Sequence, residues 1–236
     1  MSARDFFKPD TCVPPPGQVR PRRFVGMFLR QTRKDPDFDE EARKLFKSLG
    51  LDPSGNSGGF GYNPLDPIYK DPTTGGAVYV GNQTAASNRT LLDSHKITHV
   101  VNCTDNMVNY HESGTSGAMA GHGDGPDRPP LTYYRFNISY WQRYVDGSDE
   151  SVLAFVRPVF EFVDSAVAAG GAVLVHCLAG AHRAGTTGCL LLMYKAEMDV
   201  RTAISSAKKL RPAIDPIGSL PELLKRYERA RKAIPS

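Results

Sequence analysis

The stretch of sequence that decides the fold is AVLVHCLAGAHRAGT, residues 172–186. Its first five residues form a short, almost continuous apolar run, which is typical of a strand buried on both faces of a parallel sheet. Residues 178–182 are mostly small, and a helix is predicted from Arg183 to Lys195. A strand, a short loop and a helix in this order predict an α/β domain with residues 172–176 as the central strand.

The loop after this strand has the composition of an anion-binding site. Cys177 follows the strand directly, at the end of the sheet where α/β proteins commonly bind ligands. The N–H groups of the small residues can curl around an anion, and the helix start adds positive potential. The same field favours a thiolate at Cys177, since thiols at helix N-termini can have pKa values of about 3.5–7.5. The predicted phosphate-binding residues are Leu178, Ala179, Gly180, Ala181, His182 and Arg183, the last with a guanidinium fork that can bind two oxygens.

The rest of the chain divides into two parts by its pattern. Residues 1–76 are rich in proline and glycine, so we expect an N-terminal extension with little regular structure beyond a short helix at 39–49. From Ala77, strand and helix signals alternate, which predicts a catalytic domain at 77–236 with a central, largely parallel sheet flanked by helices. Strands are predicted near 78–80, 97–103 and 131–138, and helices near 84–95, 152–167, 200–210 and 220–232. The glycine-rich stretch 113–130 is predicted to be a surface loop.

Composition excludes several classes of protein. The net charge of +4 is too small to indicate a nucleic-acid surface, and the chain shows no apolar run of membrane-span or signal-peptide type. The four cysteines form no CxxC pair, which argues against a zinc site and favours a reducing compartment, the cytoplasm or the nucleus. His111 and His122 lack further residues at metal-ligand spacing. We therefore expect a soluble protein without metal or cofactor.

The cysteine loop resembles a known signature. Cys177, five residues and Arg183, preceded by His176, resemble the HCx5R signature of the protein tyrosine phosphatases, and HCLAG resembles the dual-specificity branch. VYVGNQTAASNRTLL (78–92) and ITHVVNC (97–103) resemble the opening helix and strand of dual-specificity domains, so the likeness covers about Ala77–Lys232. The resemblance implies a protein-tyrosine-phosphatase-like fold and hydrolysis of phosphate monoesters through a phosphocysteine. It also implies that His176 supports the cysteine and is neither acid nor base.

The family also uses an aspartic acid to protonate the leaving group. The spacing that is typical of the family places this acid 31 residues before Cys177, at Asp146. About half a dozen extra residues separate Ile138 from Asp146 compared with the family, so Asp149 is the alternative.

Two positions raise further expectations from the resemblance. Ala184 stands where the family usually has Ser or Thr, whose hydroxyl helps the thiolate leave, so we expect slower breakdown of the phosphocysteine. Thr186 and Thr187 lie too far along the helix to replace it. Cys103 is either a core residue or a redox partner of Cys177, as a cysteine there is in some relatives.

The sequence leaves the substrate open. Phosphotyrosine and phosphothreonine in proteins are the first expectation, and a nonprotein substrate such as a phosphoglucan, phosphoinositide or RNA 5′-triphosphate is the alternative. A third hypothesis is a catalytically weak domain that binds phosphorylated partners. Arg20, Arg22 and Arg23, followed by Val25 and Met27, resemble a docking motif for mitogen-activated protein kinases or form a solvated basic segment. Tyr140, Trp141 and Tyr144 either wall the substrate cleft or pack in the core.

Overall fold

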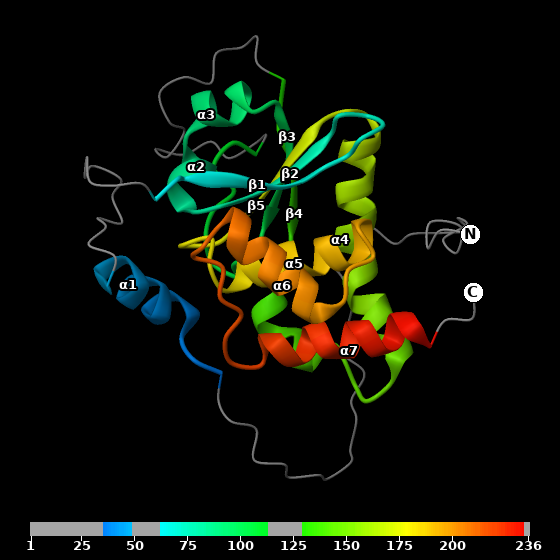
Figure 1. Cartoon of the computed structure of the whole chain (residues 1–236). Helices are drawn as coiled ribbons and strands as arrows, with labels where there is room; N and C mark the ends of the chain where they lie inside the picture. Colours follow the sequence, from blue (N-terminus) through cyan, green and yellow to red (C-terminus); the bar gives the residue numbers. More distant parts are fainter. Residues whose placement is uncertain (1–34, 49–61, 113–128, 234–236) are drawn as a thin grey trace. The chain divides into compact units, whose positions relative to one another are not determined.

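The computed structural model describes residues 35–48, 62–112 and 129–233. In this part of the chain, five strands form one sheet in the order β1-β2-β5-β3-β4 (Figure 1). Their bounds are Leu65–Lys70 for β1, Ala77–Gly81 for β2, Ile97–Asn102 for β3, Thr132–Arg135 for β4 and Ala172–His176 for β5. All neighbouring strands are parallel except β1, which pairs antiparallel with β2. The predictions of a largely parallel sheet and of β5 as its central strand are confirmed.

Helices cover both faces of the sheet (Figure 1). Two short helices, α2 (Gln83–Ser87) and α3 (Arg89–Ser94), pack on one face. The other face is covered by α4 (Asp149–Ala168), α5 (Arg183–Lys195), α6 (Val200–Leu210) and α7 (Leu220–Lys232). A 3-10 helix, η2 (Ile138–Arg143), follows β4, and α1 (Phe38–Ser48) precedes the sheet in the sequence.

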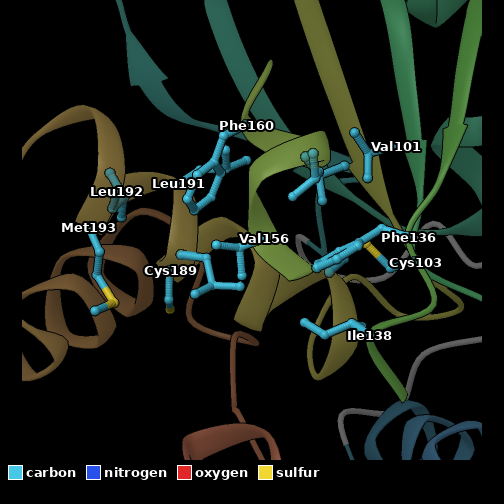
Figure 2. Close-up of a cluster of buried hydrophobic side chains, with 14 of the residues drawn as sticks. Val101, Cys103, Phe136, Ile138, Val156, Phe160, Cys189, Leu191, Leu192 and Met193 are labelled. Carbon is cyan, nitrogen blue, oxygen red and sulfur yellow. The ribbon is translucent and has the colours of Figure 1, made fainter. Parts of the chain in front are cut away.

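The central strand divides the core into two clusters because successive side chains of a strand point to opposite faces. Val173 and Val175 belong to the larger cluster, which contains the apolar side chains of α4, α5 and α7. Figure 2 shows part of this cluster, including Val156 and Phe160 of α4 and Leu191 of α5. Ala172 and Leu174 belong to the smaller cluster, beneath α2 and α3. All five residues of β5 are buried, so its carboxyl end is held rigidly from both sides.

Two predicted elements differ from the observed ones, and one observed strand was not predicted. The helix expected at 84–95 is split at Asn88, because the Asn88 side chain accepts a hydrogen bond from Leu91 N and so begins α3 as a new N-cap. The strand expected at 131–138 ends at Arg135 and is followed by η2. Strand β1 lies in a segment where no strand was expected; its Pro67 lacks an N–H, which an edge strand tolerates.

Two predictions fall mostly or wholly outside the described residues. These are the surface loop at 113–130 and the basic docking motif at 20–27. Within the described ranges, none of the helices is both long enough and apolar enough to cross a bilayer.

Candidate active site

Cys177 and Arg183 lie at the two ends of one loop at the carboxyl edge of the sheet. Cys177 follows β5, and Arg183 is the first residue of α5. Both side chains are buried, with 2% of Cys177 and 3% of Arg183 exposed. The loop between them, residues 178–182, is here called the phosphate loop.

Every carbonyl group of the phosphate loop accepts a hydrogen bond from a neighbouring part of the protein. The Leu178 carbonyl accepts a hydrogen bond from Gln83 N at 3.0 Å, and the Ala181 carbonyl accepts one from Asp215 N at 3.1 Å. The Ala179 carbonyl accepts hydrogen bonds from Tyr62 Oη and Arg211 Nη2, the Gly180 carbonyl from Arg211 Nε, and the His182 carbonyl from Thr186. Because N–H and C=O point in opposite directions in a trans peptide, this arrangement directs the loop's N–H groups to the other side.

Gly180 allows the loop to turn within a confined space. Its φ of +65° lies in the left-handed region that favours glycine. A Cβ on this residue would also lie 2.5 Å from the Gly81 carbonyl oxygen, on β2. Glycine is therefore required at this position both by the backbone conformation and by the approach of the neighbouring strand.

Arg211 holds the outer side of the phosphate loop. It follows α6, is 1% exposed, and its Nε and Nη2 lie 3.0 Å and 3.2 Å from the carbonyl oxygens of Gly180 and Ala179. Its Nη1 binds the carboxylate of Asp66 at 2.6 Å, and its guanidinium lies 4.5 Å from the centre of the Tyr62 ring. A charged side chain without a partner would be costly in this position, so Asp66 makes the burial of Arg211 tolerable.

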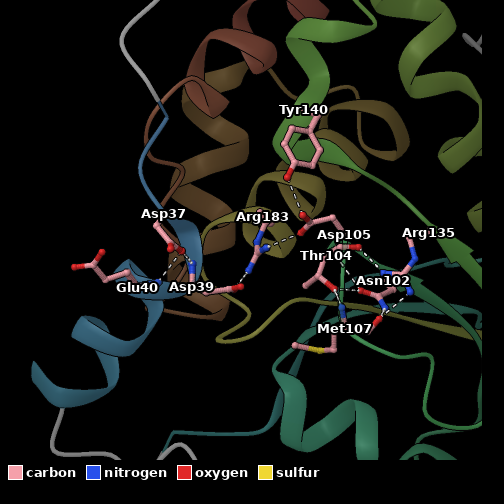
Figure 3. A network of polar contacts seen from close by, with 10 residues as sticks. All are labelled: Asp37, Asp39, Glu40, Asn102, Thr104, Asp105, Met107, Arg135, Tyr140 and Arg183. Atoms are coloured by element: carbon pink, nitrogen blue, oxygen red, sulfur yellow. Dashed lines mark hydrogen bonds and ion pairs between the residues drawn. The ribbon is translucent and has the colours of Figure 1, made fainter. Parts of the chain in front are cut away.

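The guanidinium of Arg183 lies between two carboxylates (Figure 3). Its Nη2 donates a hydrogen bond to Asp39 of α1, and its Nη1 lies 3.9 Å from Asp105, which follows β3. Its Nε is buried and has no hydrogen-bond partner among the described residues. Burial alone would lower the pKa of Arg183, but its electrostatic interactions with Cys177 and Asp39 outweigh burial and raise this pKa. The group therefore stays fully charged.

Asp105 is fixed by the polar network at the end of β3. Tyr140 Oη donates to the Asp105 carboxylate at 2.8 Å, and Arg135 Nη1 donates to the adjacent Thr104 carbonyl at 2.7 Å (Figure 3). Asn102 accepts hydrogen bonds from both the N–H and the hydroxyl of Thr104. Sequence reasoning missed Asp105, although a signal existed: β3 neighbours β5, so the residues after both strands meet at one edge of the sheet.

The predicted acid, Asp146, has contacts of a different kind. Its carboxylate accepts a hydrogen bond from Ser148 N at 2.7 Å, and Arg226 of α7 donates to its carbonyl oxygen at 3.0 Å. The hydrogen bond from Ser148 N lowers the pKa of Asp146, which favours the ionised form. The alternative, Asp149, pairs with Arg229 of α7 at 2.9 Å. The structure thus brings Cys177 and Arg183 together, while the carboxylates in contact with Arg183 are Asp39 and Asp105.

His176, the last residue of β5, is fully buried next to Cys177. Burial, together with the positive charges of Arg135 and Arg183, lowers the pKa of His176 to about 3. The imidazole is therefore neutral at physiological pH. A ring that stays neutral has no readily released proton, and the supporting role of His176 stays a prediction.

The hydroxyl groups near Ala184 are engaged within the helix. Thr186 Oγ1 donates to the His182 carbonyl at 2.7 Å, and Thr187 Oγ1 donates to the Arg183 carbonyl at 3.0 Å. Cys103 Sγ lies 3.3 Å from Thr187 Oγ1. Because the Thr187 hydrogen is used on the carbonyl, the Cys103 thiol is the donor of this contact. Burial raises the pKa of Cys103 to about 12, so this thiol is protonated.

The aromatic residues in η2 and at its C-cap, Tyr140, Trp141 and Tyr144, lie in three different environments. Tyr140 lies beside Asp105, Trp141 is 1% exposed and donates to Ser219 Oγ, and Tyr144 is half exposed and stacks on Phe155 of α4. Trp141 is therefore a core residue, whereas Tyr140 is in contact with the site. Among the described residues, no group of three His, Cys, Asp or Glu side chains is placed to hold a metal ion.

Comparisons with known proteins agree with this geometry. Residues 78–230 match the family of the dual specificity phosphatase catalytic domain. The chain belongs to this family, which sequence resemblance had predicted. It is 31% identical over 149 residues to dual specificity protein phosphatase 19 of Mus musculus, covering 63% of this chain and 58% of that protein. It is 28% identical over 139 residues to dual specificity protein phosphatase 1 of Arabidopsis thaliana, covering 59% of each. The chain thus spans under three fifths of the length of these relatives.

Solved structures show the same fold. The crystal structure of human DUSP28 superposes with a TM-score of 0.52 at 22% identity, covering 73% of this chain and 98% of that one. A mouse putative dual specificity phosphatase complexed with zinc tungstate superposes with the same TM-score at 22% identity, covering 75% of this chain and 96% of that one. The protein-tyrosine-phosphatase-like fold is therefore confirmed.

Proposed function

We propose that this protein hydrolyses phosphate monoesters on proteins, at phosphotyrosine and at phosphoserine or phosphothreonine, through a phosphocysteine formed on Cys177. The observation that carries the proposal is the phosphate loop: its carbonyls are held outward, and Cys177 and Arg183 lie at its two ends. The N–H groups and the guanidinium then stabilise the negative charge of the transferring phosphoryl group.

The reaction proceeds in two displacements. The Cys177 thiolate attacks phosphorus, the bond to the leaving oxygen breaks, and an acid gives that oxygen a proton. Water then attacks the phosphocysteine and gives a proton to the carboxylate left by the first step, and the thiolate leaves as inorganic phosphate forms. Arg183 binds two oxygens of the phosphoryl group in both steps, for which its unpartnered Nε is available.

The proton donor is proposed to be Asp146, on the spacing that is typical of the family. Asp105 is a second candidate, because it lies 3.9 Å from Arg183 and is 37% exposed. Phosphotyrosine tests the assignment well, since a phenol with a pKa of about 10 leaves poorly without a proton. We expect Asp146→Asn to lose the basic limb of the pH profile of kcat/KM, with Asp105→Asn and Asp149→Asn retaining it. Loss of that limb in one of the other two variants would reassign the acid.

Turnover of para-nitrophenyl phosphate and of phosphopeptides tests the proposed function. Cys177→Ser is expected to lower kcat at least about a thousandfold. Cys189→Ser serves as the matched control, because Cys189 is also a buried cysteine but lies in α5, and this variant should retain turnover. Survival of turnover in Cys177→Ser would refute the mechanism. Binding of phosphopeptides without turnover by the wild type would indicate the recognition module instead.

The proposed function also includes a class of substrate and a class of protein partner. Phosphorylated proteins are the proposed substrates, a mitogen-activated protein kinase among them if residues 20–27 act as a docking motif. The phosphate loop carries no lysine that could meet additional phosphates, which argues against polyphosphorylated inositides. Phosphoglucans remain a distinct outcome of a substrate screen, since Ala184 resembles the residue after the arginine in some glucan phosphatases.

A further inference from the structure

The segment from Asp35 to Ser48 lies against the phosphate loop, although it is outside the matched catalytic region. Its Asp39 carboxylate accepts a hydrogen bond from Arg183 Nη2 (Figure 3). The ring of Phe38 lies with its centre 5.7 Å from the Arg183 guanidinium carbon. The first turn of α1 therefore meets the group that is expected to bind the phosphoryl oxygens.

Specific contacts hold this segment at both of its ends. At the start, the Asp35 carboxylate accepts hydrogen bonds from Ser219 N at 2.7 Å and Ser219 Oγ at 2.8 Å, at the beginning of α7. Further along, Ala42 and Phe46 are buried against Ala179 and Ala181 of the phosphate loop. The position of Asp39 thus follows from packing on both sides of it.

The Asp39 carboxylate and a phosphoryl group need the same donors. An arginine binds an oxyanion most strongly when two parallel N–H groups meet two oxygens. One terminal nitrogen of Arg183, Nη2, is occupied by Asp39, whereas Nε is unpartnered among the described residues. A phosphate dianion on this fork would take the place of the carboxylate, and the two negative charges would also repel each other.

Asp105 is less suited to being displaced. It belongs to the network at the end of β3, where Tyr140 binds its other oxygen, and it lies 3.9 Å from Nη1. Asp39, by contrast, lies on α1, which is outside the sheet and is not fixed by the hydrogen bonds at the end of β3. The competing carboxylate is therefore assigned to Asp39.

We propose that Asp39 competes with the phosphoryl group for Arg183 and so sets the affinity of the site for its substrate. The first turn of α1 then has to release Arg183 whenever a phosphate monoester binds. This inference rests on the proposed function for its meaning in catalysis, but the competition itself requires only that the loop binds an oxyanion.

Calorimetric titration with inorganic tungstate tests the competition without turnover. The experiment compares Cys177→Ser with the double variants that add Asp39→Asn or Glu40→Gln. Asparagine keeps the shape of the side chain and removes its charge, and Glu40 is an exposed acid of the same turn that contacts Lys44. Exchanging the charged acceptor of one hydrogen bond for a neutral one corresponds to a change of about tenfold in the affinity for the competing oxyanion. Asp39→Asn is expected to tighten tungstate binding by about that factor, and Glu40→Gln to change it less than about twofold.

Kinetics provide the second measurement. In the otherwise wild-type chain, Asp39→Asn is expected to lower KM for para-nitrophenyl phosphate with little change in kcat. Unchanged or weaker tungstate binding in Asp39→Asn would overturn the inference and show that Asp39 positions Arg183 instead. Absence of turnover in every variant, together with tighter tungstate binding in Asp39→Asn, would refute the proposed function and leave the competition standing. Absence of tungstate binding in all variants would refute both.

Discussion

Arg211 Nε lies 3.0 Å from the carbonyl oxygen of Gly180, so a residue that follows α6 fixes the middle of the phosphate loop. Arg211→Lys keeps the positive charge beside Asp66 but cannot bind two carbonyl groups with one planar fork. We expect kcat/KM to fall by about tenfold or more, because the loop's N–H groups lose their fixed direction.

The control for this effect is thermal unfolding of the same variant together with Arg211→Ala. Removing the charge altogether leaves the Asp66 carboxylate, which is 14% exposed, without its cationic partner, so Arg211→Ala should be the less stable of the two variants. Full activity in a folded Arg211→Lys variant would contradict the positioning role.

Gly180→Ala is expected to disrupt the loop. The left-handed φ of +65° costs a residue with a Cβ about 1–2 kcal/mol, and the contact with the Gly81 carbonyl adds to this cost. Gly147→Ala is the matched control, because a Cβ there would meet nothing within 4 Å. Chemical unfolding should show a clear loss of stability for Gly180→Ala and a change within about 0.5 kcal/mol for Gly147→Ala. Equal stability of the two variants would show that the turn tolerates a Cβ.

The burial of His176 predicts a specific pH dependence of stability. Above about pH 6.5 the ring is neutral in the folded and the unfolded chain, so this residue contributes no slope. As the pH falls from 6.5 toward 3, the unfolded chain binds a proton that the folded chain excludes, so the free energy of unfolding falls. The expected slope from this residue approaches about 1.4 kcal/mol per pH unit.

Denaturant titrations of wild type and His176→Asn between pH 4.5 and 7 test this contribution. The variant is expected to show the shallower dependence, whatever its absolute stability. Parallel curves for the two proteins would indicate that the ring takes up a proton in the folded state.

Ala184→Ser is expected to speed up the second chemical step. It restores a hydroxyl directly after Arg183, a position that Thr186 and Thr187 cannot serve because their hydroxyls bind helix carbonyls. One hydrogen bond to the leaving thiolate corresponds to about tenfold in rate. Rapid-quench measurements should show a burst of product in the wild type and a smaller burst with higher kcat in the variant. An unchanged burst would mean that breakdown of the phosphocysteine does not limit turnover.

Much of the fold was predictable because local patterns and packing agree. The continuous apolar run at 172–176 is the central strand, and α5, α6 and α7 have the predicted bounds. The split at Asn88 was missed because the apolar spacing continues through it, while the decisive hydrogen bond comes from a polar side chain. Strand β1 was missed because Pro67, with Pro64 and Pro72 on either side of the strand, suggests a loop, and only the place of β1 at the edge of the sheet makes it possible.

The site was predictable to the extent that it is contiguous in the sequence. Cys177, Arg183 and the small residues between them could be read from one segment. Asp39, Asp105 and Arg211 come from segments far apart in the chain, and their side chains meet Arg183 or the loop only through the fold. Asp146 remains a prediction from spacing, and its contacts with Ser148 and Arg226 are properties that no spacing rule contains.

The hydrogen bonds of Ser219 have a practical consequence. Its hydroxyl accepts from Nε1 of Trp141 and donates to Asp35, at the start of the segment that carries Asp39. Trp141 is the single tryptophan of the chain. Release of the Asp35 anchor would change the polarity around one buried indole, so the protein contains its own fluorescent reporter for movement of that segment.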